Sequence, residues 1–312
     1  MLGQPGRTRW SRAVFERHPR YPQSMSLYRL SEPVDQFVAP AILAAFDGWI
    51  DAAGASTAAT VLVGGDGEAV ATFDPDALYD YRSRRPVLDV LDGKLTDLVW
   101  PDLTLKRVRH GPRDLLVLTG PEPDFRWREL SQDVLAIALK LEVVEWVSLG
   151  AIPAAVPHTR PVPILATASK QGLLTEDEQQ GPEGLLRVPS AALSAIELAV
   201  SSAGLPAVGF YAQVPHYVGG PFASATIGLL EHAGRHLGVE LPLGVLPDEA
   251  MAQRQRLDQA VADSEESREY VQRLEQMADE QGQPSGEDLV SEIERFLQQG
   301  GSEGGSGPRG ER

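Results

Sequence analysis

The sequence of 312 residues contains no cysteine. This absence excludes a disulfide-stabilised scaffold, a thiolate metal site, an iron–sulfur cluster and a cysteine nucleophile. No uninterrupted apolar run reaches the length of about 18 residues that a membrane-spanning helix needs. The N-terminal stretch also lacks the apolar segment of a signal peptide. We therefore expect a cytoplasmic protein without a membrane partner.

The sequence has few basic residues relative to acidic ones: 28 against 44, which gives a formal net charge of −16. Affinity for nucleic acid comes mostly from neutralising phosphates, so this balance disfavours a nucleic-acid partner. Residues 1–30 are the exception, with six Arg and one Glu. They mix Arg, Pro and Ser without a period and predict a mobile basic arm. The Gly/Ser-rich residues 300–312 predict a disordered tail.

Residues 31–246 alternate short apolar runs with longer segments of helical period, and this alternation predicts βαβ units. The fold class is therefore α/β, a three-layer α/β/α sandwich with a mostly parallel sheet. Leu98–Val99 and Leu103–Val108, on either side of Pro101, predict an antiparallel hairpin at an edge of that sheet. The expected strands are 41–46, 69–73, 115–119, 143–149, 162–168 and 207–214, and the expected helices are 52–63, 126–141, 189–203 and 222–237.

Residues 247–299 predict a C-terminal helical hairpin. One helix is expected from Pro247 to about Glu280, because acidic residues occupy its first turn and apolar residues follow at helical spacing. A second helix is expected to begin at Ser285, which is a favourable N-cap residue with Asp288 at the capping-box position. Since such a hairpin cannot bury its apolar stripe alone, we expect it to dock on the α/β body or on another subunit.

Ligands of parallel sheets bind at the carboxyl ends of the strands, so the residues that follow each strand are the candidates for a site. Asp47, Trp49 and Asp51 follow the first strand, and Asp51 is expected to cap the next helix or to act in acid–base chemistry. Arg82, Arg84 and Arg85 follow the second strand. They could clamp an anion, or form an ion-paired turn with Asp74, Asp76 and Asp80.

The later strands end in further polar segments. Glu122 and Asp124 share a rigid loop with Arg126, where two carboxylates could divide acid and base roles, although Asp124 is better explained as a helix N-cap. Val-Pro-His triplets occur at two strand ends, one with His158 and Arg160 and one with His216 and Tyr217, and could bring two imidazoles into one crevice. With no P-loop lysine and no HExxH spacing, we expect neither a cofactor nor a metal.

Six segments in order resemble the proteasome assembly chaperone two family, in its actinobacterial branch. The resemblance covers roughly residues 26–300 and implies an α/β/α sandwich similar to purine nucleoside phosphorylases, often as a homo-oligomer. Eukaryotic and archaeal relatives act as chaperones of the proteasome α-ring, so the resemblance implies proteasome α-subunits as possible partners. Gly310-Glu311-Arg312 does not match the hydrophobic-Tyr-any motif by which some of them dock. The segments are 46–52, 71–74, 80–86, 120–124, 156–161 and 214–217.

Two functions from different classes follow. The first is a non-enzymatic, protein-binding assembly factor or scaffold, which the family resemblance and the helical hairpin favour. The alternative is a protein that binds, cleaves or phosphorolyses a nucleoside-like or anionic ligand. In that case Arg82, Arg84 or Arg85 would hold the anion, Trp49 or Tyr217 would stack on a base, and Glu122, Asp51 or His158 would do acid–base work.

Overall fold

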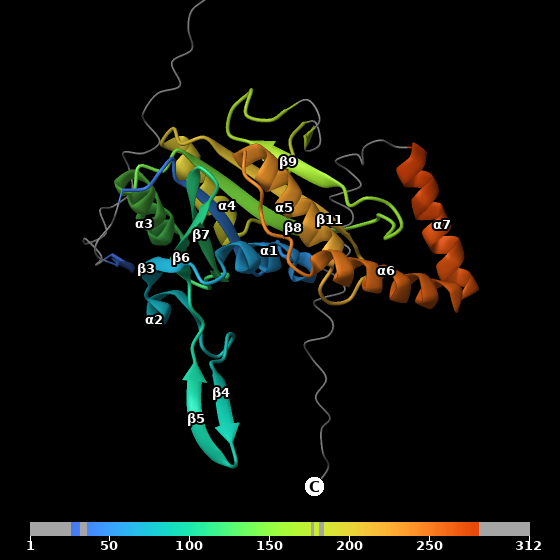
Figure 1. The fold of residues 1–312 in the computed structure, drawn as a ribbon, viewed down its shortest axis with the longest axis horizontal. Helices are drawn as coiled ribbons and strands as arrows, with labels where there is room; N and C mark the ends of the chain where they lie inside the picture. The colour runs from blue at the N-terminus through green and yellow to red at the C-terminus, as the bar shows by residue number, and fades with distance from the viewer. Residues whose placement is uncertain (1–25, 32–35, 176–177, 181–183, 281–312) are drawn as a thin grey trace, which may run out of the picture.

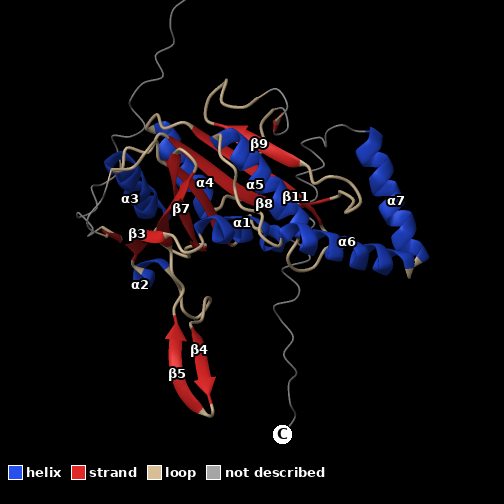
Figure 2. Cartoon of the chain, viewed as in Figure 1, coloured by secondary structure: helices blue, strands red, loops and turns tan. Residues whose placement is uncertain are grey.

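A computed structural model describes residues 26–31, 36–175, 178–180 and 184–280. Its main element is a sheet with the strand order β1-β3-β6-β7-β2-β8-β11-β9-β10 (Figure 1). Helices cover both faces of this sheet, so the predicted three-layer α/β/α fold is confirmed (Figure 2). The strands are β1 (Tyr28–Leu30), β2 (Ala41–Asp47), β3 (Glu68–Phe73), β6 (Thr104–His110), β7 (Arg113–Pro121), β8 (Glu145–Ala154), β9 (Ile164–Ala168), β10 (Gln179–Gln180) and β11 (Ala207–Pro215).

The central strands β7, β2, β8 and β11 are mutually parallel. Antiparallel pairs extend the sheet on both sides, through β6 and β3 on one side and β9 on the other. Because β6 is antiparallel to both β7 and β3, β3 runs in the same direction as the central strands. The carboxyl ends of β2, β3, β7, β8 and β11 therefore meet at one edge, where the sequence places its candidate site.

The central strands are apolar on both faces because helices cover both sides of the sheet. On β2, Ile42 and Ala44 belong to the core cluster beneath α3 and α4, whereas Leu43 and Ala45 belong to the cluster beneath α1 and α5. The short α2 lies on the α3 side. The helices are η1 (Ala52–Gly54), α1 (Ala55–Gly64), α2 (Pro75–Leu78), α3 (Trp127–Lys140), α4 (Ala192–Ser202) and α5 (Ala223–Leu237).

The edge hairpin expected around Pro101 is wrong. Strand β4 (Val87–Leu91) pairs instead with β5 (Lys94–Val99) in a separate two-stranded hairpin, and β6 joins the main sheet between β3 and β7. The reason is local turn chemistry. Asp92 and Gly93 both adopt positive φ, of 51° and 76°, and an Asp-Gly pair in that conformation matches the twist of a tight hairpin. The hairpin projects from the body of the molecule (Figure 1).

The C-terminal extension consists of α6 (Leu246–Ala262) and α7 (Glu265–Glu280). The single helix expected over this range is thus broken near Ser264, whose hydroxyl accepts the N–H of Ser267 at 3.3 Å. A Ser N-cap followed by two glutamates is a favourable helix start, which explains the break. No helix in the described ranges has both the length and the apolar character needed to cross a membrane.

Other expectations concern the ends of the chain. Tyr28–Leu30, which we assigned to a mobile arm, pairs with β3 as an edge strand. Tyr28 packs against Phe73, with a ring-centroid distance of 6.3 Å, and Leu27 is buried, so these residues have core contacts that the composition of the arm conceals. The rest of that arm, the helix expected from Ser285 and the Gly/Ser tail lie outside the described residues.

Candidate functional site

The residues predicted for the site lie at the carboxyl edge of the sheet in two groups. The first group follows β2, β3 and β7, and the second follows β8 and β11. None of the hydrogen bonds described below connects one group to the other. We therefore treat the two groups in turn.

Glu122 holds the first group together. It is 8% exposed, and its carboxylate accepts the backbone N–H of Trp49 at 3.0 Å and that of Ala192 at 2.7 Å. Its own N–H donates to the Asp47 carbonyl at 2.8 Å. A side chain at Gly48 would collide with Glu122, because a Cβ there would lie 2.5 Å from its atoms. One buried carboxylate thus joins the β2 loop to the start of α4.

Asp51 satisfies the first turn of α1, which is one of the two roles expected for it, although the N-cap residue itself is Gly54. Its Oδ1 accepts the Ser56 N–H at 2.7 Å and the Ser56 hydroxyl at 2.6 Å, and the N–H of Thr57 donates to both carboxylate oxygens at 3.3 Å. These donors belong to the first turn of α1, where backbone N–H groups have no helical partner.

Asp124 does not cap α3, so that prediction is wrong. The N-cap residue is Arg126, with a left-handed φ of 59° and no side-chain cap. Asp124 instead accepts the Asp80 N–H at 2.9 Å and faces the Arg84 Nε at 3.6 Å. The Asp124 carboxylate therefore turns towards the loop after β3, because the Asp80 N–H and the Arg84 guanidinium of that loop are its hydrogen-bond and ion-pair partners. Arg126 itself pairs with Glu129.

The arginine turn differs in its partners from the expected ion-paired turn. Asp74 caps α2, and Asp76 accepts the Tyr81 hydroxyl at 2.6 Å, so neither is the partner of an arginine. Arg82 and Arg85 have exposed side chains. Trp49, at 39% exposure, is also accessible at this edge. Ligand binding by these residues, and by Asp47, stays a prediction.

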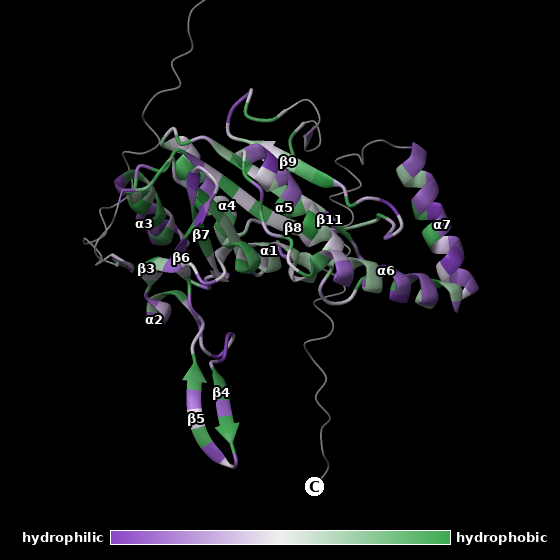
Figure 3. Ribbon diagram, in the orientation of Figure 1, coloured by the Kyte–Doolittle hydropathy of each residue, from purple (hydrophilic) through white to green (hydrophobic). Residues whose placement is uncertain are grey.

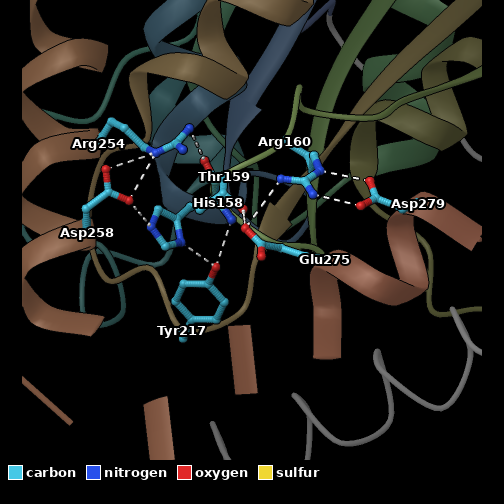
Figure 4. A network of polar contacts seen from close by, with 8 residues as sticks. All are labelled: His158, Thr159, Arg160, Tyr217, Arg254, Asp258, Glu275 and Asp279. Atoms are coloured by element: carbon cyan, nitrogen blue, oxygen red, sulfur yellow. Dashed lines mark hydrogen bonds and ion pairs between the residues drawn. The ribbon is translucent and has the colours of Figure 1, made fainter. Parts of the chain in front are cut away.

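The second group confirms that the two Val-Pro-His segments come together. The rings of His158 and His216 both lie edge-on to Tyr217, at centroid distances of 5.7 and 5.6 Å. The His158 side chain is 1% exposed. Its backbone N–H donates to the Tyr217 hydroxyl at 2.8 Å, and its Nδ1 lies 2.7 Å from the same oxygen (Figure 4).

These contacts fix the tautomer of His158. Because the Tyr217 oxygen already accepts the backbone N–H, its proton is free to donate to Nδ1, and Nε2 then donates to Asp258 Oδ1 at 3.2 Å. Burial lowers the pKa of His158 below its usual value of 6.5, although Asp258 opposes that shift. Burial also raises the pKa of Tyr217 to about 12. The imidazole is therefore neutral at pH 7, and its two nitrogens connect Tyr217 to Asp258 of α6 by hydrogen bonds.

Arg160 binds α7. It donates to Asp279 through Nε at 2.9 Å and Nη2 at 2.7 Å, and its Nη1 lies 3.4 Å from Glu275. Thr159 also donates to Glu275. Figure 4 shows these side chains converging from the loop after β8 and from α7. The bidentate geometry is typical of a strong guanidinium–carboxylate pair.

Further contacts dock α6 and the start of α7. Arg254 donates from Nη1 to the His158 carbonyl at 3.2 Å, and its Nε lies 3.2 Å from Asp258 on its own helix. The hydroxyl of Tyr270 lies 3.0 Å from His216 Nε2. The second group therefore binds the C-terminal helices to their own body. The sequence analysis missed these helix residues, and the signal that could have found them is the acidic excess of the C-terminal segment beside Arg160.

The fold and this edge define an α/β/α protein whose C-terminal helices dock over the ends of β8 and β11. The chain belongs to the PAC2 family, which residues 45–261 match. All six segments that carry the resemblance, 46–52, 71–74, 80–86, 120–124, 156–161 and 214–217, fall within that range.

Solved structures with the same fold come from actinobacteria. A protein of unknown function from Mycobacterium tuberculosis, Rv2714, is 30% identical, with a TM-score of 0.80 over 89% of this chain and 99% of its own. The proteasome-assembly chaperone homologue Rv2125 from the same organism is 36% identical, with a TM-score of 0.68 over 74% and 99%. A PAC2 family protein from Streptomyces avermitilis is also 36% identical, with a TM-score of 0.66 over 74% and 99%. No curated protein matches this sequence.

Proposed function

We propose that this protein is a cytoplasmic, protein-binding assembly factor or scaffold that self-associates, and that proteasome α-subunits are its partners. The observation that carries the proposal is the β4–β5 hairpin, which projects from the body, contributes no residue to either core cluster and carries apolar residues among polar ones (Figure 3). Membership of the PAC2 family and the likeness to Rv2125, a proteasome-assembly chaperone homologue, support it.

One face of the hairpin is aliphatic. The register pairs Leu88 with Leu98 and Val90 with Leu95, because a bulge after Asp89 shifts the pairing by one residue. Residues directly opposite share a face, as do residues two apart on one strand. The four side chains are 48%, 40%, 55% and 73% exposed, in that order. Large apolar side chains gathered on one exposed face are typical of a protein-binding surface.

The other face is mixed, because the pairs Val87–Val99 and Leu91–Lys94 lie on either side of two like charges. Asp89 lies directly opposite Asp97, and a cross-strand pair of like charges is destabilising. A two-stranded hairpin on its own is only marginally stable in water and needs a further strand or a packed surface. The hairpin is therefore better suited to a bound state, in which a protein surface covers its aliphatic face, than to isolation.

The small-molecule alternative has less support at the carboxyl edge. Asp51 and Glu122, its candidate acid–base residues, are 8% exposed and accept hydrogen bonds from backbone N–H groups of their own chain. His158 is buried between Tyr217 and Asp258. A catalytic group must be able to reach its substrate. These three side chains are instead engaged in hydrogen bonds within the protein.

The test compares the wild-type chain with the double variant Leu88→Ser/Leu95→Ser and with Leu139→Ser, a 66% exposed leucine on α3. We expect light scattering after size exclusion to give an oligomer for the wild type and for Leu139→Ser, and a monomer for the hairpin variant. A wild type that is monomeric, or a hairpin variant that retains the wild-type mass, contradicts self-association through the hairpin.

Partner binding is measured separately. We expect the tagged wild type to enrich proteasome α-subunits from its native cytoplasm over a tag-only control, and the hairpin variant to lose that enrichment while Leu139→Ser keeps it. Recovery of the protein alone contradicts the proposal of proteasome partners, and leaves self-association to the mass measurement.

A further inference from the structure

A cavity of about 530 Å³ lies between the loop that follows β8, α5 and α6. Its lining includes Ser224, Glu231 and His232 of α5 and Arg254 of α6, with Ile227 and Leu257 as apolar wall. Ser224, Gly228, Glu231 and His232 recur at helical spacing, so one face of α5 forms one side of the cavity. Gly228 leaves this face without a side chain in its middle. The cavity adjoins the second group of site residues, because His158, Thr159 and Arg160 also line it.

The polar groups on the α5 side retain hydrogen-bonding capacity, and Glu231 is exposed to solvent. Among the described residues, neither the Ser224 hydroxyl nor the Glu231 carboxylate has a hydrogen-bond or ion-pair partner. His232 Nδ1 lies 2.8 Å from the Gly228 carbonyl, so this nitrogen carries the proton and Nε2 is an unprotonated acceptor. The ring packs against Phe210 at a centroid distance of 5.9 Å. The cavity thus offers a carboxylate and a fixed imidazole acceptor at Glu231 and His232.

The opposite charge lies at the other end. Gln253 accepts the Ala223 N–H at 3.2 Å, which places this part of α6, and Arg254 with it, beside the start of α5 and Ser224. The Arg254 guanidinium is oriented by Asp258 at Nε and by the His158 carbonyl at Nη1. Its Nη2 has no partner among the described residues.

The two ends are well separated. Glu231 lies seven residues after Ser224 on α5, a rise of about 10 Å along the helix. Ile227 and Leu257 lie on the wall, which suits an apolar chain. A simple anion would meet the Glu231 carboxylate, and a simple cation would meet the Arg254 guanidinium, so neither satisfies both ends.

We propose that this cavity binds a linear zwitterion, a carboxylate and an amine joined by a short aliphatic chain. Arg254 and the Ser224 hydroxyl receive the carboxylate, and Glu231 and His232 Nε2 receive the ammonium group. This chemistry is that of ω-amino carboxylates and of basic amino acids. The proposal concerns a surface other than the hairpin and is independent of the proposed assembly function.

The test titrates the full-length protein by calorimetry with 6-aminohexanoate, hexanoate and hexylamine. We expect 6-aminohexanoate to bind at least about tenfold more tightly than either single-charge analogue, because each end adds a charge-assisted hydrogen bond. Equal binding of 6-aminohexanoate and hexylamine, or no binding by any of the three probes, overturns the proposal.

Variants locate the site. Glu231→Gln should weaken 6-aminohexanoate binding by about tenfold and leave hexanoate unchanged. Ser224→Ala should weaken 6-aminohexanoate and hexanoate alike. Neither residue contributes to a hydrogen bond that holds α6, so both variants should fold, as circular dichroism verifies. Glu240→Gln, an exposed carboxylate in the turn after α5, is the matched control. Equal effects of Glu231→Gln and Glu240→Gln overturn the assignment.

Discussion

Glu122, which is buried, and Glu197, which is half-buried, make opposite use of their charge. Glu122 accepts two backbone N–H groups and needs both carboxylate oxygens as acceptors. Glu197 on α4 accepts only the Ser148 hydroxyl, at 2.6 Å, and Ser148 in turn accepts the Trp146 indole N–H at 2.7 Å. Burial raises the pKa of Glu197 above its usual 4.5. The same Glu→Gln substitution should therefore have opposite effects at the two positions.

Glu122→Gln should destabilise the fold by about 1–3 kcal/mol, because an amide NH₂ would face a backbone N–H that then lacks an acceptor. Urea unfolding checks this change, with Glu240→Gln at an exposed site as the control. An unfolding free energy equal to that of the control would contradict the clamp role of Glu122.

Glu197→Gln should stabilise the protein at pH 7, since the amide oxygen still accepts the Ser148 hydroxyl and no charge is desolvated. The native pKa is raised, so wild-type stability is full below pH 4.5 and falls as the pH rises through the native pKa. The advantage of the variant should thus grow as the pH rises from 4.5 to 7. Thermal unfolding of both proteins across that range measures it, and a difference that does not change with pH counts against the assignment.

At the scale of elements, α6 and α7 depend on polar contacts for their position. No side chain of α6 is buried, and α7 buries only Val271 and Leu274. Most of the remaining contacts pair arginines and histidines with helix carboxylates. Contacts between exposed charges are screened by salt, so the docking of α7 should weaken as ionic strength rises.

Arg160→Glu should release α7, because it places a carboxylate beside Asp279 and Glu275. Amide hydrogen exchange over 265–280 should speed up, while the midpoint of global unfolding changes little. The double variant Arg160→Glu/Asp279→Arg restores one opposite pair and should slow that exchange again. If the second substitution gives no recovery, the Arg160–Asp279 pair does not hold the helix.

The elements that the sequence predicted are those with strong periodic signals. Strand β2 is apolar on both faces, and α3 and α5 carry an apolar stripe beside a polar face, so their patterns survive without tertiary information. Strand β4 was not predicted because all its residues are exposed and give no burial pattern. The Asp92-Gly93 pair was the turn signal that could have identified the hairpin. The break at Ser264 was missed because a helical period continues across it.

The sequence predicted where the candidate-site residues lie, but it did not predict which residues they contact. Strand ends are local features, so His158 and His216 could be assigned to one edge from their contexts. The partner of Arg160 lies 119 residues further along the chain, and no local pattern links the two. Asp124 was wrongly assigned as the cap of α3. An Asp just before a helix has the same sequence pattern whether its carboxylate caps that helix or binds a distant loop.

At the scale of the whole molecule, stability is unevenly distributed. The central strands β2, β8 and β11 are buried on both faces, whereas every residue of β4 and β5 is exposed. Local opening is easiest where few apolar contacts must break. Hydrogen exchange should be slowest in the central strands. In the Leu88→Ser/Leu95→Ser variant it should be faster over 87–99 than in the wild type, where the proposed self-association would cover the hairpin. Equal rates there would contradict that coverage.

The hairpin also has a bearing on how the chain can be altered. Its strands contribute no side chain to either core cluster, and it leaves and re-enters the body between Pro86 and Pro101. We therefore expect that the hairpin can be removed without unfolding the rest of the protein. A short glycine linker in place of 87–99 should leave a folded α/β/α body that lacks the proposed binding surface, and the hairpin could be grafted onto another scaffold to test whether it binds on its own.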